Sequence, residues 1–484
     1  MNSTFLNRLC LIGFLVNVNV CSALEIDNLN LPEMGDSAGT LISPQEEKQL
    51  GEAFFRGLHQ QVEINQDTEI QQYIQTIGEK LVSQSDTPAY PFHFFVVMEN
   101  AINAFAGPGG YVGVNSGLIL MTDAESELAS VMAHEIAHVT QRHLYRSYEA
   151  SSRLSIPMVA ATLGAILLGT QSGAAGQAAI MAIQAGSVQF QINFTREHEE
   201  EADRVGMQTL SKSVFDPRSM PTFFERLQQS TRYAGQNIPE FLRTHPVTTS
   251  RISDSRGRAE SYPYKQYPDS LAYQLIKTKL QVLVSVDNDG IRALLQARLN
   301  QGLPEQRTVA NYGLGLVALK TQNFTQADSI FQGLAQQFPQ QPHYSAALAR
   351  VALESSHYKV ALDRYQKLMN KFPENDSIKI EYVGALLKAG EPSNAKAILF
   401  QLSQKTRNLP IFSQLLAQIY GDLNQPAESH RYLADYYFAM GETQQAILQI
   451  RLAQQIRNIS PQLVAILHEK LAFLLATDEQ ERRR

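Results

Sequence analysis

A 34-residue repeat in the second half of the chain constrains the fold more than any other feature. Six positions recur in one register, as small, aromatic, small, aromatic, aliphatic and proline. The first copy comprises Gly315, Phe324, Ala327, Phe331, Leu334 and Pro339, and the second comprises Ala349, Tyr358, Ala361, Tyr365, Leu368 and Pro373. Such a period is typical of solenoids built from pairs of antiparallel helices, each burying its apolar face against its neighbours. We therefore predict that this half of the chain is all-α.

The spacing matches the tetratricopeptide pattern. A third, weaker copy keeps Ala395, Leu399 and Leu402, with Pro392 in place of the aromatic residue. Before the repeats, the Tyr- and Pro-rich stretch "AESYPYKQYPD" marks a change of composition that is typical of a domain boundary. We predict a tetratricopeptide-repeat domain over residues 263–484 and a separate domain over residues 24–262.

The first 23 residues have the features of a cleaved secretory signal peptide. Arg8 supplies a positive charge, "LCLIGFLVNVNV" is an apolar stretch too short to span a membrane, and "CSA" offers small residues for cleavage. The alternative is a buried N-terminal helix. Both cysteines, Cys10 and Cys21, lie in this segment, so a metal site in the mature chain must use His, Asp and Glu.

Charge and hydropathy limit the partners of the protein. The formal net charge is -6 and no basic stripe stands out, which argues against nucleic-acid binding. Residues 154–195 carry no charged residue, and their two apolar pieces are each shorter than the roughly 20 residues of a membrane span. This segment predicts either a buried or lid-forming helical hairpin or a peripheral membrane contact.

The domain before the repeats reads as α+β. "SPQEEKQLGEAFFRGL" begins with an N-cap at Ser43 and a capping box completed by Glu46, which predicts a helix. "FHFFVVM" and "YVGVNSGLIL" have the composition of strands, separated by a turn at "GPGG". Helices beside a small sheet are the result.

The stretch "HEIAH" predicts a metal site. His134 and His138 are four residues apart, so on a helix they present their imidazoles on one face to a single ion. Glu135 lies beside that face, where it can accept a proton from water at the ion. A third protein ligand is required, and the longer HExxHxxGxxH pattern is excluded because Gln141 and Leu144 stand at its glycine and last histidine.

"TREHEEEADRVG" is the candidate for the missing ligand. Glu199 and Asp203 are four residues apart on one helix face, and Ala202 and Gly206 keep that side slim. Glu199 is expected to bind zinc, and Asp203 to hydrogen-bond a ligand histidine from behind. The alternative is an acidic first helical turn that complements the helix dipole. His143 and His198 are expected to point away from the metal, at the surface.

"HEIAH", "REHEEEAD" and "THPVTTSRI", preceded by "FAGPGGYVGVNSGL", resemble the M48 family of zinc metallopeptidases, in the order that the family has them. The resemblance implies one zinc ion per chain, held by His134, His138 and Glu199, with Glu135 as the catalytic base. It also implies that the edge strand around residues 111–115 holds the substrate in extended form.

The same resemblance places His245 on a loop near the metal, and Pro246 biases it toward extended backbone. Three roles stay open. His245 could occupy the fourth zinc position and silence the site. It could instead stabilise the transition state while Arg251 neutralises charge, or it could only pack the loop.

A secreted member of this family with tetratricopeptide repeats implies a function in the periplasm of a Gram-negative bacterium. There it would degrade misfolded or stalled outer-membrane proteins and assist their assembly, with the repeats recruiting substrate or the assembly machinery. The alternative is a non-proteolytic chaperone or scaffold that acts through its repeats.

Overall fold

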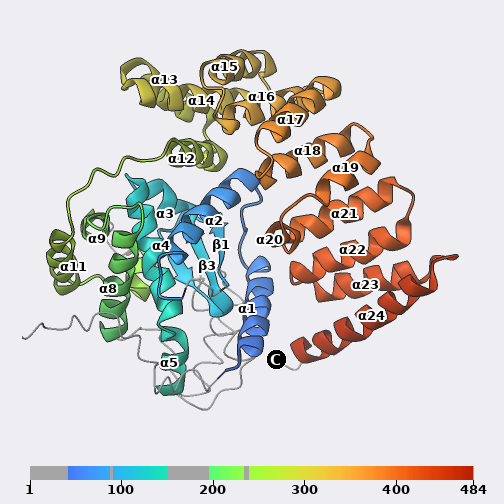
Figure 1. The fold of residues 1–484 in the computed structure, drawn as a ribbon, viewed down its shortest axis with the longest axis horizontal. Helices are drawn as coiled ribbons and strands as arrows, with labels where there is room; N and C mark the ends of the chain where they lie inside the picture. Colours follow the sequence, from blue (N-terminus) through green and yellow to red (C-terminus); the bar gives the residue numbers. More distant parts are fainter. Residues whose placement is uncertain (1–41, 88–90, 151–195, 234–238, 483–484) are drawn as a thin grey trace, which may run out of the picture.

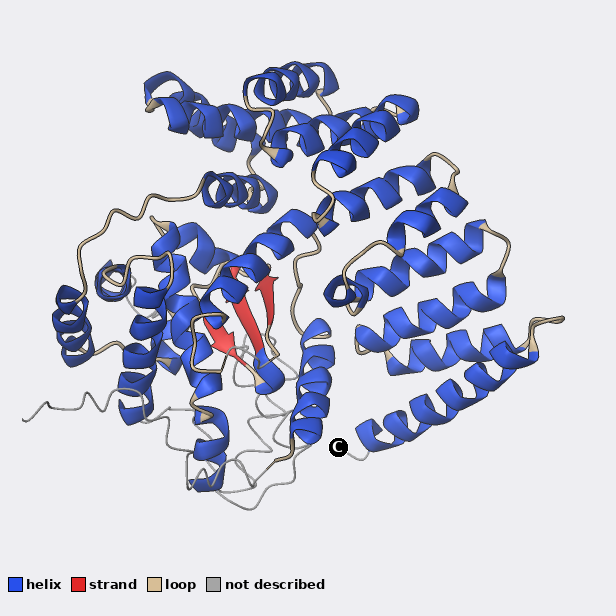
Figure 2. Ribbon diagram, in the orientation of Figure 1, coloured by secondary structure: helices blue, strands red, loops and turns tan. Residues whose placement is uncertain are grey.

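The structure of the protein is a computed structural model that describes residues 42–87, 91–150, 196–233 and 239–482. The expected signal peptide at residues 1–23 and the uncharged segment at residues 154–195 lie outside the described residues. Among the described residues, no helix is both long enough and apolar enough to span a membrane. An α+β part comes first and a purely helical part follows, as the sequence predicts (Figures 1 and 2).

The sheet of the first part has three strands. They are β1 (His93–Val97), β2 (Ala104–Ala106) and β3 (Tyr111–Asn115), in the order β1-β3-β2, with β1 parallel and β2 antiparallel to β3. Because β3 is paired on both sides, the expectation of an edge strand at residues 111–115 is wrong. Within the described residues, the short strand β2 provides the outer edge on that side of the sheet.

Two further details of this region differ from the expectation. The "GPGG" turn joins β2 to β3 through the short 3-10 helix η2 (Pro108–Gly110) and does not separate the two longer strands. The apolar "SGLIL" forms helix α3 (Ser116–Met121) instead of extending β3. The Ser116 hydroxyl and the Gly117 N–H both donate to the Glu99 carbonyl, which turns the chain away from the sheet. A short apolar run does not by itself distinguish helix from strand.

Helices surround the sheet. They are α1 (Pro44–His59), α2 (Thr68–Val82), α4 (Glu125–Thr140), α5 (His143–Ala150), α8 (Arg196–Lys212), α9 (Ser219–Tyr233), α10 (Glu240–Thr244) and α11 (Thr249–Ser261). Helix α4 lies at the centre, in contact with α2, α8, α9, β2 and β3. Every residue from Glu125 to His138 is buried, which explains why this helix carries almost no amphipathic pattern.

Local signals set where the first two helices begin. The capping box predicted at Ser43 is present: its hydroxyl accepts from the Glu46 N–H, and the Glu46 carboxylate accepts from the Ser43 N–H. At the start of α2, the Asp67 side chain accepts from the Glu69 and Ile70 N–H groups. The apolar face of α2, with Ile70, Ile74 and Ile77, packs into the main core.

The second part is a solenoid of helix pairs, which confirms the repeat prediction (Figure 1). Its helices are α13 (Asn288–Gln301), α14 (Pro304–Lys320), α15 (Phe324–Gln337), α16 (Pro342–Glu354), α17 (Tyr358–Lys371), α18 (Asp376–Lys388), α19 (Pro392–Leu399), α20 (Gln404–Arg407), α21 (Pro410–Asp422), α22 (Pro426–Ala439), α23 (Thr443–Gln454) and α24 (Pro461–Arg482). The repeated positions Phe331 and Tyr365 are buried between helices, as are Ala395 and Leu399 of the weaker third copy.

Helix α12 (Leu271–Val284) belongs to both parts. Tyr273, Ile276 and Leu280 lie in the core around α4, whereas Leu275 and Val282 lie in the first core of the repeats. The Tyr273 hydroxyl also donates to the Thr122 carbonyl, just before α4. One helix therefore carries packing from the repeats into the domain that contains "HEIAH".

The repeats curve around the side of the first part that carries α1 and α2 (Figure 1). At the start of α2, Glu69 meets Lys279 of α12 and the His343 imidazole of α16. Farther along, the Thr68 hydroxyl hydrogen-bonds Ser377 of α18 at 2.7 Å. These contacts join residues about two to three hundred positions apart into one molecule.

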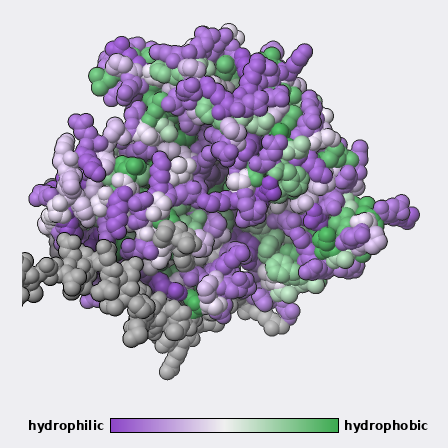
Figure 3. Space-filling view, viewed as in Figure 1, coloured by the Kyte–Doolittle hydropathy of each residue, from purple (hydrophilic) through white to green (hydrophobic). Residues whose placement is uncertain are grey.

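Hydrophilic residues cover most of the face seen in Figure 3, and the hydrophobic ones lie among them. Toward the C-terminus, Leu448 of α23 and Phe473 and Leu475 of α24 are exposed. Scattered exposed apolar residues of this kind are ordinary on a folded protein.

Candidate metal centre

Helix α4 places two imidazoles side by side. His134 and His138 are one helical turn apart, and their Nε2 atoms lie 3.0 Å from each other. Both rings are buried, with 1% and 3% of each residue exposed. The helix lies within the core on all sides, so these nitrogens face a protein interior and not bulk solvent.

Helix α8 brings a carboxylate to the same point. Glu199 Oε2 lies 3.5 Å from His134 Nε2, and Oε1 lies 3.4 Å from His138 Nε2. The two helices approach closely because α8 is slim where they cross: a Cβ on Gly206 would lie 3.1 Å from the backbone of Ala133 and His134. The structure thus brings Glu199 together with the two histidines of "HEIAH".

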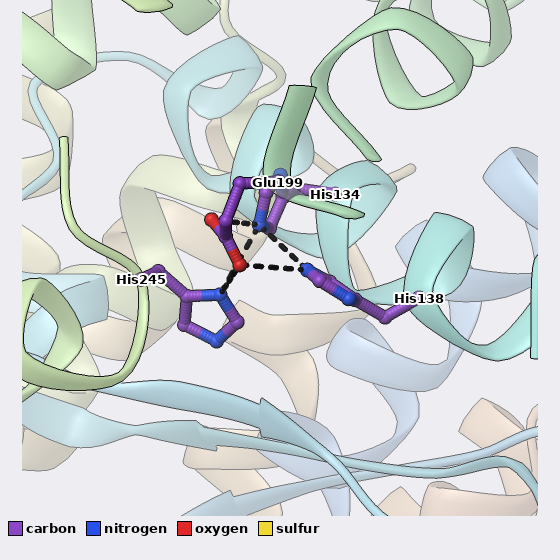
Figure 4. Close-up of side chains that lie close together, drawn as sticks. All are labelled: His134, His138, Glu199 and His245. Carbon is purple, nitrogen blue, oxygen red and sulfur yellow. Dashed lines mark hydrogen bonds and ion pairs between the residues drawn. The ribbon is translucent and has the colours of Figure 1, made fainter. Parts of the chain in front are cut away.

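His245 completes the cluster from a third element. It directly follows α10, where its N–H donates to the Phe241 carbonyl and its ring stacks on the Phe241 ring at 4.9 Å. Its Nδ1 lies 2.8 Å from Glu199 Oε1 and 3.4 Å from His134 Nε2. One donor atom from each of His134, His138, Glu199 and His245 falls within a group no wider than 4.8 Å (Figure 4).

Asp203 supports His134 from behind. Its Oδ1 lies 3.0 Å from His134 Nδ1, the ring nitrogen that faces away from the cluster. Arg251 of α11 holds this carboxylate with two hydrogen bonds of 2.7 Å, and a third guanidinium nitrogen lies 2.6 Å from Glu199 Oε2. A proton kept on Nδ1 by Asp203 leaves Nε2 of His134 free to bind a cation.

Glu135 lies beside the cluster without joining it. Its carboxylate faces the backbone N–H of Ala106 in β2, which favours the charged form. Its Oε1 lies 3.6 Å from His245 Nε2 and accepts no hydrogen bond within the described part of the chain. Burial raises the pKa of Glu135, which favours a carboxylate that takes up a proton readily.

The electrostatics of the cluster suit a cation. Burial lowers the pKa of His138 to about 3, so that this ring is neutral at pH 7. Burial also disfavours the charged form of Glu199, but the neighbouring His245 and hydrogen bonds from the histidines hold its pKa well below the usual value. Burial would lower the pKa of His134, yet hydrogen bonds to Asp203 and Glu199 raise it to about 9. At pH 7 the raised pKa keeps a second proton on the His134 ring, and a metal ion bound at Nε2 would replace it.

These residues fit a metal ion. Three imidazole nitrogens and one carboxylate oxygen converge on a common centre. The helices and the loop that carry these residues could form without this grouping. Imidazole with carboxylate is a donor set that proteins use for zinc and other transition metals.

The expectation that His143 and His198 lie at the surface is wrong, although neither supplies one of the four donor atoms of the cluster. Both are buried, and their rings stack at 4.5 Å beside the cluster. His143 contacts His138, and its other nitrogen meets Glu201. Helical phase placed His143 far from the metal, but α4 ends before it. Arg142 has a left-handed backbone (φ 54°), and α5 then starts in a new direction.

Two family models match the chain. The model of peptidase family M48 matches residues 69–259, which include every residue of the cluster, and a tetratricopeptide repeat model matches residues 352–419.

Known proteins resemble it over most of its length. The beta-barrel assembly-enhancing protease of Escherichia coli K12 is 35% identical over 417 residues, covering 86% of this chain and 85% of that protein. A putative beta-barrel assembly-enhancing protease of Vibrio cholerae is 37% identical, covering 83% of each chain. A mitochondrial metalloendopeptidase OMA1 of Schizosaccharomyces pombe is 29% identical over 180 residues, or 37% of this chain and 50% of that protein.

Proposed function

We propose, on the premise that this chain belongs to peptidase family M48, that it is a zinc endopeptidase whose repeats bring it to its substrates. The observation that carries the proposal is the convergence of His134, His138 and Glu199 next to a carboxylate that stays outside the donor set, Glu135.

His134 Nε2, His138 Nε2 and Glu199 would hold the ion. A bound zinc ion supplies Lewis acidity, which polarises a carbonyl group and acidifies water. Asp203 keeps His134 in the tautomer whose Nε2 is free, and Arg251 fixes Asp203 in place.

Glu135 serves as the general base. It is adjacent to the ligands on α4, and its raised pKa matches a group that accepts a proton and later returns it. Its carboxylate lies near the Ala106 N–H at the edge of the sheet, where a substrate chain would lie.

The outer edge of β2 is the proposed binding site for the substrate backbone. Gly107 donates to Tyr111 and Asn115 donates to Asn103, so the odd-numbered residues of this strand pair with β3. By the alternation of an antiparallel ladder, the peptide groups of Ala104 and Ala106 point outward. Ala104 is fully buried, so an extended substrate would reach this edge at Ala106, beside His138, as in β-augmentation.

For His245 we propose the role of a latch. Its imidazole already lies among the donor atoms, with Nδ1 at 2.8 Å from Glu199, in the place where a fourth ligand would bind. A fourth protein ligand silences zinc catalysis because the open position is lost. The rival role for Arg251, neutralising charge on a substrate, is disfavoured because its guanidinium is engaged with Asp203 and Glu199.

His245→Ala tests the latch. Removal of a fourth ligand should raise the rate of proteolysis, including self-cleavage, when rates are compared at matched zinc occupancy. A transition-state stabiliser would lower activity on the order of 10²-fold instead. Lower activity would contradict the latch, and an unchanged rate would leave His245 with a packing role alone.

The relatives suggest where and on what the enzyme acts. Their names place those proteins in β-barrel assembly, and the similarity runs through both the peptidase and the repeats. We extend this to a protein exported by residues 1–23 to the periplasm, where it degrades misfolded or stalled outer-membrane proteins. The repeats would recruit these substrates or the assembly machinery.

The alternative is a chaperone or scaffold without proteolysis, and Glu135→Gln separates the two. Because Glu135 is a base and not a ligand, the variant should keep zinc and lose at least about 10²-fold of the cleavage rate on a misfolded outer-membrane protein. His134→Ala is the control that should release zinc. Equal cleavage by wild type and Glu135→Gln would sink the peptidase mechanism, and no cleavage by wild type would favour the chaperone.

A further inference from the structure

The two ligand histidines of α4 are supported differently. The far nitrogen of His134 meets the Asp203 carboxylate directly. The far nitrogen of His138, Nδ1, lies 2.9 Å from Nδ1 of a second imidazole, His143, which is completely buried. This contact lies outside the roles given to the site so far.

A hydrogen bond between two imidazole nitrogens needs one proton between them. When His138 binds a cation through Nε2, its own proton is on Nδ1, so His143 Nδ1 must accept. The proton of a neutral His143 is then on Nε2. That atom lies 3.1 Å from Glu201 Oε2 and donates to it. Each tautomer follows from the one before it.

Glu201 is itself fixed. Arg146 of α5 donates to its Oε2 at 2.9 Å, which balances the charge of the carboxylate. The His198 ring covers one face of His143 with the two planes only 15° apart, so His143 is held in its orientation.

We propose that His143 and Glu201 are positioning residues that orient His138 and make it a better ligand, through a relay from carboxylate to imidazole to imidazole. The inference rests on the proposed zinc site. Three residues of helix α8, each two positions from the next, would then act at the metal site. Glu199 binds the ion, Glu201 supports His138 through His143, and Asp203 supports His134.

Zinc affinity, measured by competition with a chelator, tests the relay in the full-length protein. His143→Leu fills the space but neither accepts nor donates, and it should weaken zinc binding by about 10- to 100-fold, the usual effect of removing a partner of a ligand histidine. His143→Gln can both accept and donate, and it should recover most of the affinity. Glu200→Ala, an exposed neighbour on α8, should have no effect.

A double-mutant cycle separates a relay from simple packing. If His143 and Glu201 act in series, the variant with both His143→Leu and Glu201→Ala should lose no more affinity than His143→Leu alone. With Co²⁺ in place of zinc, the visible absorption spectrum should shift in His143→Leu and return toward wild type in His143→Gln.

Three results would overturn the relay: wild-type affinity in His143→Leu, losses that add in the cycle, or a Gln variant as weak as the Leu variant. If His143→Leu does not fold, Glu201→Ala and His143→Gln carry the test, and the relay then requires that Glu201→Ala weakens zinc binding. A wild-type protein that binds no zinc would refute the proposed function itself, which is a separate outcome.

Discussion

The His59 imidazole, at the end of α1, is partly buried and lies edge-on against the Phe55 ring, with the two ring centroids 4.7 Å apart. Within the described residues its Nε2 has no hydrogen-bond partner. Burial lowers the pKa of His59 to about 4, because the charged ring loses its hydration and gains no partner.

From the lowered pKa of His59 we predict that the folded protein becomes less stable in acid. The unfolded chain protonates His59 near pH 6.5 and the folded chain only near pH 4, so between these values the unfolded state binds more protons. Stability from this group should fall as the pH drops from about 6.5 to 4, by roughly 3 kcal/mol in total.

Denaturant unfolding at pH 7 and pH 4.5 checks it, with His59→Phe as the comparison. The variant should lose less stability than wild type over this interval. Parallel losses in the two proteins would show that His59 contributes nothing to the acid sensitivity.

At the scale of residues, spacing alone located the part of the site that one helix face determines. His134 and His138 are related by one turn of α4, and Glu199 and Asp203 by one turn of α8, so sequence reasoning could pair them. The partnership of His138 with His143 depends on the left-handed backbone of Arg142, which is not a glycine and gave no signal of a turn. Helical periodicity gives the wrong side-chain directions beyond a helix end that the sequence does not signal.

At the scale of elements, the site depends on how closely α8 crosses α4. The crossing occurs at Gly206, whose missing side chain lets the two backbones approach. A methyl group there would push against the backbone of Ala133 and His134, which cannot yield as the end of a side chain can. Glu199, the proposed third ligand, would then move away from both histidines.

Gly206→Ala is therefore predicted to weaken zinc binding by about 10-fold or more, the scale for disturbing a ligand's support. Gly257→Ala, in the open middle of α11, is the matched control. No atom lies within 4 Å of its added methyl group, so it should leave zinc binding unchanged and stabilise the protein by up to about 1 kcal/mol. Zinc affinity and thermal unfolding of both variants decide the matter. Wild-type affinity in Gly206→Ala would mean that the helices can separate without cost to the site.

Elements also show where local pattern is ambiguous. The repeat period predicted the helix pairs because the same kinds of residue recur at six positions, and each copy packs in the same way. The sheet had no such redundancy. Three residues, Ala104–Ala106, form its edge strand, and they are too few to produce an alternating pattern. The expectation of an edge strand at residues 111–115 rests on the family resemblance, and no local pattern in the sequence points to Ala104–Ala106 instead.

At the scale of the whole molecule, a buried charged group joins the two parts. Glu69 of α2 meets Lys279 of α12, and Arg350 of α16 lies 3.7 Å from the same carboxylate. Lys279 is only 3% exposed. No sequence pattern points to this contact, since Glu69 and Lys279 are 210 residues apart and each looks like an ordinary surface charge.

Removal of Glu69 should weaken the joint between the two parts. Glu69→Ala leaves the buried Lys279 with Asp67 as its remaining carboxylate partner, and it is predicted to cost about 1–3 kcal/mol. Glu79, on the same helix, pairs with the exposed Lys405 at 2.7 Å, and Glu79→Ala should cost less than about 1 kcal/mol. Differential scanning calorimetry measures both, and in Glu69→Ala it should show a lower or divided transition. Similar small losses in the two variants would mean that solvent compensates for the lost pair.

The outward-facing peptide groups of β2 have a consequence for when a substrate can bind during its own folding. A chain can bind there only while one of its own strands has unpaired N–H and C=O groups, and a closed barrel has no free strand edges. Under the proposed mechanism, recognition thus depends on the folding state of the substrate and hardly on its sequence. If the proposed substrates are right, cleavage would compete kinetically with barrel closure. A precursor that assembles quickly would escape, and one that stalls with an open edge would become more exposed to cleavage the longer it waits.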